Sequence, residues 1–138
     1  MTVSGPSKKD KRLRILVVDD VPDTREVLSR NLFLEGYEVT AASSAGEAMD
    51  VLTQKDVDRV CTDLKMPGAD GMSLARHVKA RQPGVAVVII TGYPAGETEM
   101  AVLAQGVDGF LTKPFTDVEL LSVVRSALKG DGGRRREP

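Results

Sequence analysis

Five polar residues that suit metal or phosphoryl chemistry come directly after short apolar segments of the chain. Asp19 and Asp20 follow one such segment, and Asp63 closes another. Thr91 and Lys113 follow two more. Neighbouring carboxylates repel one another, and gathering them is costly unless a cation joins them. If the fold brings these residues together, they predict an oxygen-ligand site for Mg²⁺, with Lys113 as a second positive charge.

The segments that carry these residues predict strands alternating with helices. Apolar runs of strand length predict five strands, at residues 13–18, 37–41, 57–62, 85–90 and 109–112. Capping and turn residues predict five helices, starting at Pro22, at the capping box Ser44–Glu47, at Ser73, at Glu97 and at the capping box Thr116–Glu119. A turn-rich loop over residues 67–71 precedes the third helix, and the fifth helix should end near Gly130.

Residue spacing supports the first helix. The residues that keep a helical spacing within it are Thr24, Val27, Leu28, Asn31 and Leu32. The third strand is the weakest prediction, because Asp58 and Arg59 interrupt its apolar run.

Continuous apolar strands separated by helices indicate a parallel sheet with both faces covered. Five such units predict an α/β fold of the flavodoxin-like, doubly wound type, with a five-stranded parallel sheet in the order 2-1-3-4-5 and five helices. Strands 1 and 3 are neighbours in that order. Asp19, Asp20 and Asp63 should therefore meet at the carboxyl edge, where ligands bind in sheets of this type.

Length and composition indicate one compact domain. The 138 residues are 41% hydrophobic, and 19 Lys and Arg oppose 20 Asp and Glu, which argues against a nucleic-acid-binding or membrane-surface protein. The longest apolar run, residues 85–90, is too short to span a membrane. The single cysteine, Cys61, predicts a buried structural thiol in a reducing, cytoplasmic setting. We expect disordered tails over residues 1–12 and 130–138, flanking a domain over residues 13–129.

From about Arg14 to Leu128 the sequence resembles the receiver domains of two-component response regulators. The resemblance is carried by the motifs VVDD, TDLKMPGADG, IITG and FLTKPF. It implies that Asp63 is the phosphoacceptor. It also implies that Asp20 and Asp63 bind Mg²⁺ directly, that Asp19 binds it through water, and that the backbone carbonyl of Lys65 is a further ligand.

The same resemblance assigns roles to the later motifs. Thr91 and Lys113 would contact the phosphoryl group, and Lys113–Pro114 would be a cis peptide bond. Thr91 and Phe110 would form the conformational switch. The family most often has Tyr at the position of Phe110, so a signal that needs the tyrosine hydroxyl is not expected here.

Two further positions concern the lifetime of the phosphorylated state. In the resemblance, Lys65 and Tyr93 flank the path by which water attacks an aspartyl phosphate. Both side chains are large and neither is a competent general base at neutral pH. We therefore expect slow self-dephosphorylation.

The resemblance predicts a phosphoacceptor signalling domain that assists its own phosphorylation and dephosphorylation, and not an enzyme. The phosphoryl group would come from a sensor histidine kinase or a histidine phosphotransfer protein. The domain would signal to a protein partner through the face made by the fourth helix, fifth strand and fifth helix, or relay the phosphoryl group. We expect a stand-alone receiver, monomeric or weakly dimeric, that binds neither nucleic acid nor a membrane.

Three alternatives accompany this interpretation. The chain could be a receiver excised from a longer DNA-binding regulator or hybrid kinase. A phosphatase of the haloacid dehalogenase type would need a second aspartate two residues after Asp63, where Lys65 stands. A nucleotide- or flavin-binding module would need a phosphate-cradling loop after the first strand, where Asp19 and Asp20 would repel the phosphate.

Overall fold

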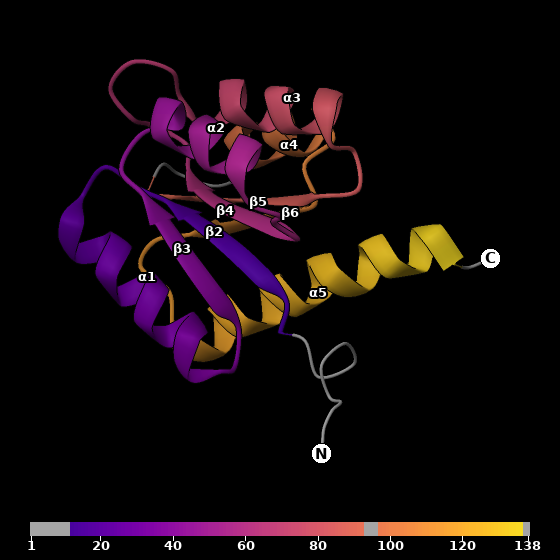
Figure 1. Cartoon of the computed structure of the whole chain (residues 1–138), viewed down its shortest axis with the longest axis horizontal. Coiled ribbons are helices and arrows are strands. Elements are labelled where there is room, and N and C mark those ends of the chain that lie inside the picture. The colour runs from indigo at the N-terminus through magenta and orange to yellow at the C-terminus, as the bar shows by residue number, and fades with distance from the viewer. Residues whose placement is uncertain (1–11, 93–96, 137–138) are drawn as a thin grey trace.

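Five parallel strands form the centre of the molecule, with helices on both faces (Figure 1). The computed structural model describes residues 12–92 and 97–136, and the side chains of residues 12–92 and 100–127. The strands are β2 (Arg14–Val18), β3 (Glu38–Ala42), β4 (Arg59–Asp63), β5 (Ala86–Thr91) and β6 (Gly109–Thr112). Their spatial order is β3-β2-β4-β5-β6, which confirms the predicted order 2-1-3-4-5.

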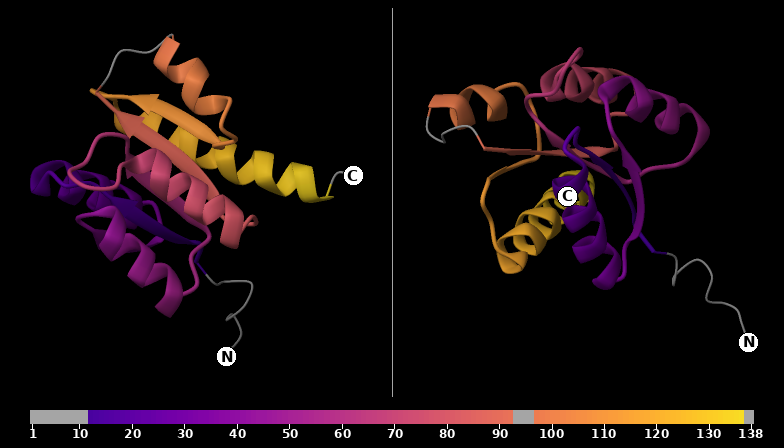
Figure 2. Two further views of the ribbon diagram at one scale, coloured as in Figure 1. Left: turned by 90° about the horizontal axis from the view of Figure 1, so that it is seen from above. Right: turned by 90° about the vertical axis from the view of Figure 1, so that its left-hand side faces the viewer.

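The helices divide between the two faces of the sheet. One face carries α1 (Pro22–Leu34) and α5 (Asp117–Arg136), and the other carries α2 (Ala45–Gln54), α3 (Gly71–Arg81) and α4 (Glu97–Leu103), as Figures 1 and 2 show. A separate hydrophobic core lies on each face, and buried Cys61 belongs to the core under α1 and α5. Within the described ranges, no helix has both the length and the apolar character needed to cross a membrane.

The predicted capping box of α5 is confirmed, and that of α2 is confirmed on one side. In α5, Glu119 N donates to Thr116 Oγ1 at 3.1 Å, and Thr116 N donates to the Glu119 carboxylate at 2.9 Å. In α2, Glu47 N donates to Ser44 Oγ at 3.1 Å. The Glu47 carboxylate, however, accepts from Ser43 N at 2.7 Å, one residue earlier than a capping box requires.

The start of α3 differs from the prediction at Ser73. The helix begins at Gly71, and its N-cap is Asp70, whose Oδ1 accepts from Ser73 N at 2.9 Å. Ser73 is thus the residue that donates to the cap. Aspartate and serine are equally good N-caps, and Asp-Gly is also a common turn pair, so residue type alone does not fix this boundary.

Helix α1 buries only some of the residues that keep its helical spacing. Leu28 and Leu32 are fully buried, but Val27 is 53% exposed. Phe33 and Leu34 at its end are 60% and 71% exposed. Helix α1 packs at the edge of the sheet, on the edge strand β3 and its neighbour β2. Only the side chains that face these two strands are therefore buried.

Helix α5 extends beyond its predicted end. We expected it to stop near Gly130, but the helical backbone continues to Arg136, and Figure 1 shows its last turns projecting past the sheet. Glycine in a helix interior costs about 1 kcal/mol relative to alanine, which weakens a helix without terminating it. The predicted helix end near Gly130 is therefore corrected to Arg136, whereas the predicted tails and domain boundaries stay predictions.

Two aspartates clamp the amino ends of strand pairs, at the edge of the sheet away from the predicted site. Asp58 accepts from Arg14 N at 2.8 Å, and its own N donates to Arg14 O at 2.8 Å. Asp108 repeats this arrangement with Val87 at 2.8 Å and 2.8 Å, and also accepts from Lys79 Nζ at 2.7 Å. Asp58 thus precedes β4 and caps its neighbour, which explains why its charge does not disrupt a strand that is buried throughout.

We expect Asp108→Ala to lower the free energy of unfolding by about 2 kcal/mol, because it leaves the Val87 N–H without its acceptor and the Lys79 ammonium without its carboxylate partner, with only the Val85 carbonyl remaining for the lysine. The Asp108 side chain is 5% exposed. Asp56→Ala is the control, because Asp56 is 89% exposed and 3.8 Å from Arg14, and it should change little. Urea unfolding followed by circular dichroism measures both, and equal effects of the two variants would contradict the clamp.

Candidate phosphoacceptor site

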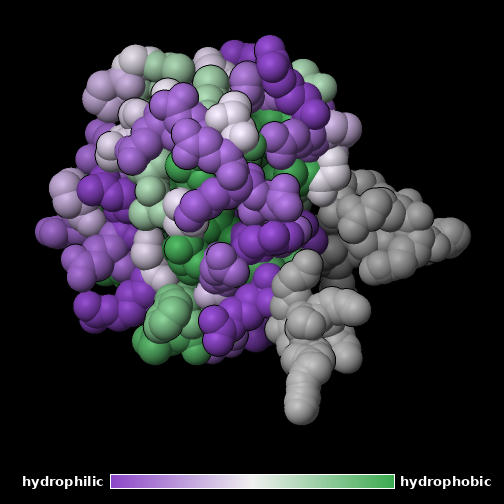
Figure 3. Space-filling model, viewed as in Figure 1, coloured by the Kyte–Doolittle hydropathy of each residue, from purple (hydrophilic) through white to green (hydrophobic). Residues whose placement is uncertain are grey.

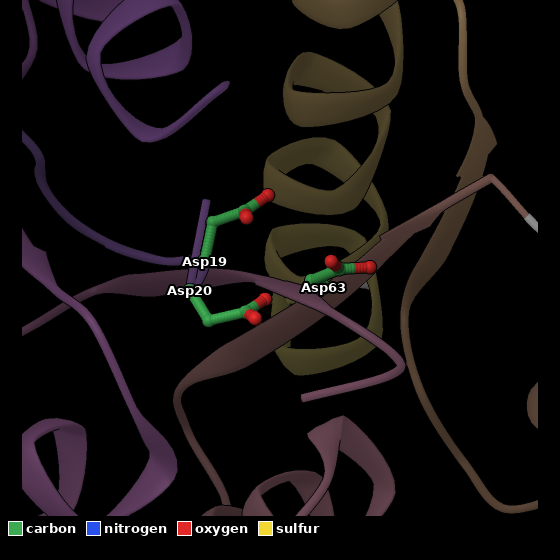
Figure 4. A group of neighbouring side chains, drawn as sticks. All are labelled: Asp19, Asp20 and Asp63. Atoms are coloured by element: carbon green, nitrogen blue, oxygen red, sulfur yellow. The ribbon is translucent and has the colours of Figure 1, made fainter. Parts of the chain in front are cut away.

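Three carboxylates meet where two neighbouring strands end (Figure 4). Asp19 and Asp20 directly follow β2, and Asp63 is the last residue of β4. These strands pair in parallel, with Val18 opposite Thr62, so their carboxyl ends lie side by side. One carboxylate oxygen from each aspartate lies within 4.8 Å of the others. The structure therefore brings together the acidic cluster that the sequence predicts.

Lys113 enters the cluster from the end of β6. Its Nζ lies 3.1 Å from Asp19 Oδ2 and 3.4 Å from Asp63 Oδ2. The Lys113 backbone N also donates to Thr91 O at 2.8 Å, which fixes the lysine beside the end of β5. A single ammonium thus bridges two of the three carboxylates, one from each of the two central strands.

Asp63 is buried at the floor of the cluster, where ionisation is unfavourable. Burial raises the pKa of the Asp63 carboxyl, the Lys113 ammonium lowers it, and the neighbouring Asp19 raises it again, with a net upward direction. Asp63 Oδ1 accepts from Leu64 N at 2.8 Å, a bond that favours the charged form but does not reverse the balance. In this arrangement Lys113 alone does not offset the charge of the cluster.

Backbone contacts hold the two acidic loops in place, and two of the residues involved were not predicted from the sequence. Arg25 on α1 donates from Nη1 to Asp19 O at 2.8 Å. Gly71 at the start of α3 packs on the backbone of Asp63. Arg25 has no distinctive spacing in the sequence, and the Asp70-Gly71 pair signals only a turn, so neither role is apparent before the fold is known.

The remaining predicted residues lie around the cluster. Thr91 ends β5 and is completely buried. Phe110 lies in β6, partly buried against the core beneath α2, α3 and α4, and opposite Ile89 in the register. The Lys113–Pro114 peptide bond is cis, as predicted. Thr91 and Phe110 therefore belong to adjacent strands, as a coupled pair requires, and their switch role stays a prediction.

The two predicted lifetime residues are placed only in part. Lys65 is exposed, two residues after Asp63. Tyr93 lies outside the described residues. The slow dephosphorylation that they suggest stays a prediction.

The donor set suits a hard divalent cation. It consists only of oxygen ligands, all three of them aspartates. Mg²⁺ prefers such ligands and is usually held by one or two carboxylates, with water and a phosphate completing its shell. The carboxylates lie at adjacent carboxyl ends of parallel strands, the usual place for ligands in a doubly wound sheet.

Comparison with known proteins identifies the family. The family model for the response regulator receiver domain matches residues 15–125. The chain belongs to this receiver domain family. The match covers β2 from its second residue, the other four strands and all of the site, from the acidic pair after β2 to Lys113 after β6. Membership in this family sets aside the phosphatase and the nucleotide-binding alternatives. The chain is a signalling domain of the phosphoacceptor type and not a classical enzyme.

Individual relatives agree with this assignment. The receiver is 38% identical over 119 residues to the transcriptional regulatory protein GlrR of Escherichia coli K12, covering 86% of this chain and 27% of the relative. It is 35% identical over 117 residues to the response regulator MprA of Mycobacterium sp. strain KMS, covering 85% and 51%. The chain thus spans about a quarter to a half of the length of these curated relatives.

Solved structures give the same fold. A CheY-like receiver domain protein from Methanospirillum hungatei superposes with a TM-score of 0.82 at 28% identity, over 90% of this chain and 99% of that one. The response regulator TrrA of Thermotoga maritima, solved in complex with Mg²⁺ and BeF, gives a TM-score of 0.75 at 31% identity, over 83% and 98%.

We expect Asp63→Asn to be more stable than the wild type at neutral pH in metal-free buffer. The raised pKa means that ionised Asp63 costs stability. That cost is absent below the pKa of the unfolded chain, about 3.9, and grows as the pH rises through the folded pKa. The advantage of Asn should therefore disappear as the pH falls below about 4.

Thermal melts of the wild type and of Asp63→Asn in EDTA, between neutral pH and below about pH 4, measure the difference in stability. Asp50→Asn is the control, because Asp50 is exposed on α2 and should show no such pH-dependent gain. A less stable Asp63→Asn at neutral pH would show instead that the contact with Lys113 outweighs burial and repulsion.

Proposed function

We propose that Asp63 accepts a phosphoryl group from a phosphohistidine of a sensor histidine kinase or a histidine phosphotransfer protein. The observation that carries this proposal is the cluster itself, in which three carboxylates and one lysine converge on the end of β4 in a receiver domain. Asp63 is the member at the end of the central strand, flanked by Lys113 and partly desolvated. Buried Asp19 and half-buried Asp20 complete the acidic cluster beside it.

Mg²⁺ is the proposed cofactor of this site. Asp20 and Asp63 would hold it directly, Asp19 through water, and the backbone carbonyl of Lys65 would be a further direct ligand. Bound there, the ion supplies positive charge to the phosphoryl oxygens during transfer. The complex of TrrA with Mg²⁺ and BeF supports the choice of metal, because that receiver is 31% identical to this one.

The chain's own residues account for the transfer step. A carboxylate oxygen of Asp63 attacks phosphorus in line, the P–N bond to the donor imidazole breaks, and its electron pair returns to the imidazole nitrogen. The Lys113 ammonium neutralises charge on the phosphoryl oxygens, and the Thr91 hydroxyl donates a hydrogen bond to one of them. Because the domain supplies these groups itself, it assists its own phosphorylation and dephosphorylation.

The phosphodonor partner would approach over α1 and the start of α5. A surface hollow opens beside the acidic cluster and shares Lys113 with it; its other lining residues are Asp23, Thr24, Val27, Pro114 and Phe115. Exposed Val27 and Leu34 are seven residues, about two helical turns, apart on the same side of α1. Figure 3 also shows hydrophobic surface at the carboxyl end of α1, the end of that helix away from the acidic cluster. A partner that covers α1 and fills the hollow beside Lys113 would bring its histidine near Asp63.

The output would use the surface made by α4, β6 and α5, at the β6 edge of the sheet. Met100 and Leu103 on α4 are 72% and 41% exposed, which gives an output partner apolar surface to bind. Thr91, following a phosphoryl oxygen inward, would let Phe110 repack against the core, and packed cores respond to such shifts in a two-state manner. Relay of the phosphoryl group to a second histidine is the other output. The stand-alone, monomeric and cytoplasmic character of the protein stays a prediction.

We expect acetyl phosphate and Mg²⁺ to add one phosphoryl group to the wild type and none to Asp63→Ala, because Asp63 is the attacking group. Intact-mass analysis measures the adduct, which should resist acid and be lost in base, as an acyl phosphate is. Asp50→Ala, an exposed aspartate on α2, should be labelled like the wild type. A retained adduct in Asp63→Ala would place the phosphoacceptor elsewhere.

We expect Mg²⁺ to raise the melting temperature of the unmodified protein and Asp20→Ala to abolish the rise. A ligand that binds only the folded state stabilises it by about 2.7 kcal/mol at a hundred-fold excess over its dissociation constant. Asp23→Ala is the near-neighbour control, since Asp23 is exposed in the first turn of α1 and lies outside the cluster. Melts with and without Mg²⁺ measure the shift. A wild type that does not respond to millimolar Mg²⁺ would rule out the cluster as its site.

A further inference from the structure

Gly71 occupies the tightest glycine position among the described residues. A Cβ at this residue would lie 2.1 Å from Asp63 O and 3.0 Å from both Asp63 C and Leu64 Cα. These are backbone atoms of the phosphoacceptor segment and not the ends of flexible side chains. Gly71 does not have a positive φ, so the position requires glycine for space and not for backbone conformation. The amino end of α3 can therefore lie against Asp63 only because residue 71 has no side chain.

The contact is linked to the Asp63 carboxylate by two hydrogen bonds in series. Gly71 N donates to Leu64 O at 2.8 Å, which closes the loop of residues 64–70 on itself. Leu64 N in turn donates to Asp63 Oδ1 at 2.8 Å. The peptide groups on either side of Leu64 thus join the start of α3 to one oxygen of the attacking carboxylate.

The strand side of this contact cannot easily give way. The Asp63 carbonyl that a Cβ would strike also accepts from Thr62 Oγ1 at 2.9 Å. Strand β4 is buried throughout and is paired on both sides, to β2 and to β5. A side chain at residue 71 would therefore displace the loop of residues 64–70 and the amino end of α3. This displacement would first break the hydrogen bond from Gly71 N to Leu64 O.

We propose that Gly71 is a positioning residue for phosphoryl transfer, because the absence of a Cβ lets α3 fix the Leu64 peptide groups that aim the Asp63 carboxylate. This inference rests on the proposed function of Asp63. It differs from a general packing role, because it predicts that the geometry of the reacting carboxylate changes when residue 71 gains a single carbon atom.

The test compares three variants with the wild type. Gly71→Ala introduces the clash. Gly46→Ala makes the same chemical change in the first turn of α2, where the nearest atom to the new Cβ is Ser44 Oγ at 3.9 Å. Val78→Ala truncates a buried side chain of α3 itself, far along the helix from the site, and serves as the control for lost stability.

Two readouts apply to each protein under conditions in which circular dichroism shows it to be folded. The first is the rate of phosphoryl incorporation from acetyl phosphate at saturating Mg²⁺, measured by intact mass. The second is the ¹⁹F NMR spectrum of bound beryllofluoride, which reports the geometry around the carboxylate and does not depend on turnover.

We expect Gly71→Ala to lose about ten- to a hundred-fold in rate, the size of effect that a displacement of about 1 Å produces in a reacting group, and to show a shifted or weakened beryllofluoride signal. Gly46→Ala and Val78→Ala should keep the wild-type rate and spectrum, although Val78→Ala melts at a lower temperature. A wild-type rate in Gly71→Ala, or an equal loss in Val78→Ala, would overturn the proposal. A wild type that takes up no phosphoryl group would instead contradict the proposed function.

If Gly71→Ala does not fold, the proposal is tested on the wild-type protein instead. Backbone amide NMR should then show that the Gly71 and Leu64 signals move together when beryllofluoride binds, since their hydrogen bonds are in series. The Gly84 amide, which lies in open surroundings before β5, should not move. A Leu64 shift without any response at Gly71 would overturn the proposal.

Discussion

The structure of the functional edge depends on the repulsion between carboxylates held at adjacent strand ends. Parallel pairing of β2 with β4 forces Asp19 and Asp63 together, and the sheet that pairs these strands is buried on both faces. Lys113 bridges the two, yet the pKa of Asp63 remains raised. The fold therefore maintains an excess of negative charge there, which favours a divalent cation and, with it, a phosphoryl group.

The rest of the molecule makes this unfavourable arrangement rigid. Two hydrophobic cores clamp the sheet from opposite faces, and aspartate clamps such as that of Asp108 tie the strands together at the far edge. Near the site, Arg25 holds the backbone of the β2–α1 loop and Gly71 holds the backbone of the β4–α3 loop. The two loops that carry the aspartates are thus held through main-chain atoms, while the carboxylates of Asp19 and Asp63 are themselves bridged by Lys113.

The proposed input and output surfaces lie on different parts of the molecule. Lys113 and Pro114 border a hollow shared with α1, whereas Thr91 and Phe110 lie on the neighbouring strands β5 and β6. A phosphoryl group at Asp63 would touch both sets through Lys113 and Thr91. In this proposal a single buried site is phosphorylated by a partner bound at one surface and changes the conformation of another surface. Only a few packed residues separate the two.

The sequence alone determined the alternation of strands and helices, the strand order and the acidic cluster, because apolar periodicity and the residues at strand ends are local properties of the chain. It also placed Cys61 in the core. Only the tertiary structure decided which side chains of α1 are buried, that Asp70 and not Ser73 caps α3, and that Gly71 lies against Asp63. These features depend on which atoms of segments far apart in the sequence come into van der Waals contact. The order of residue types along the chain does not contain the distances between those atoms.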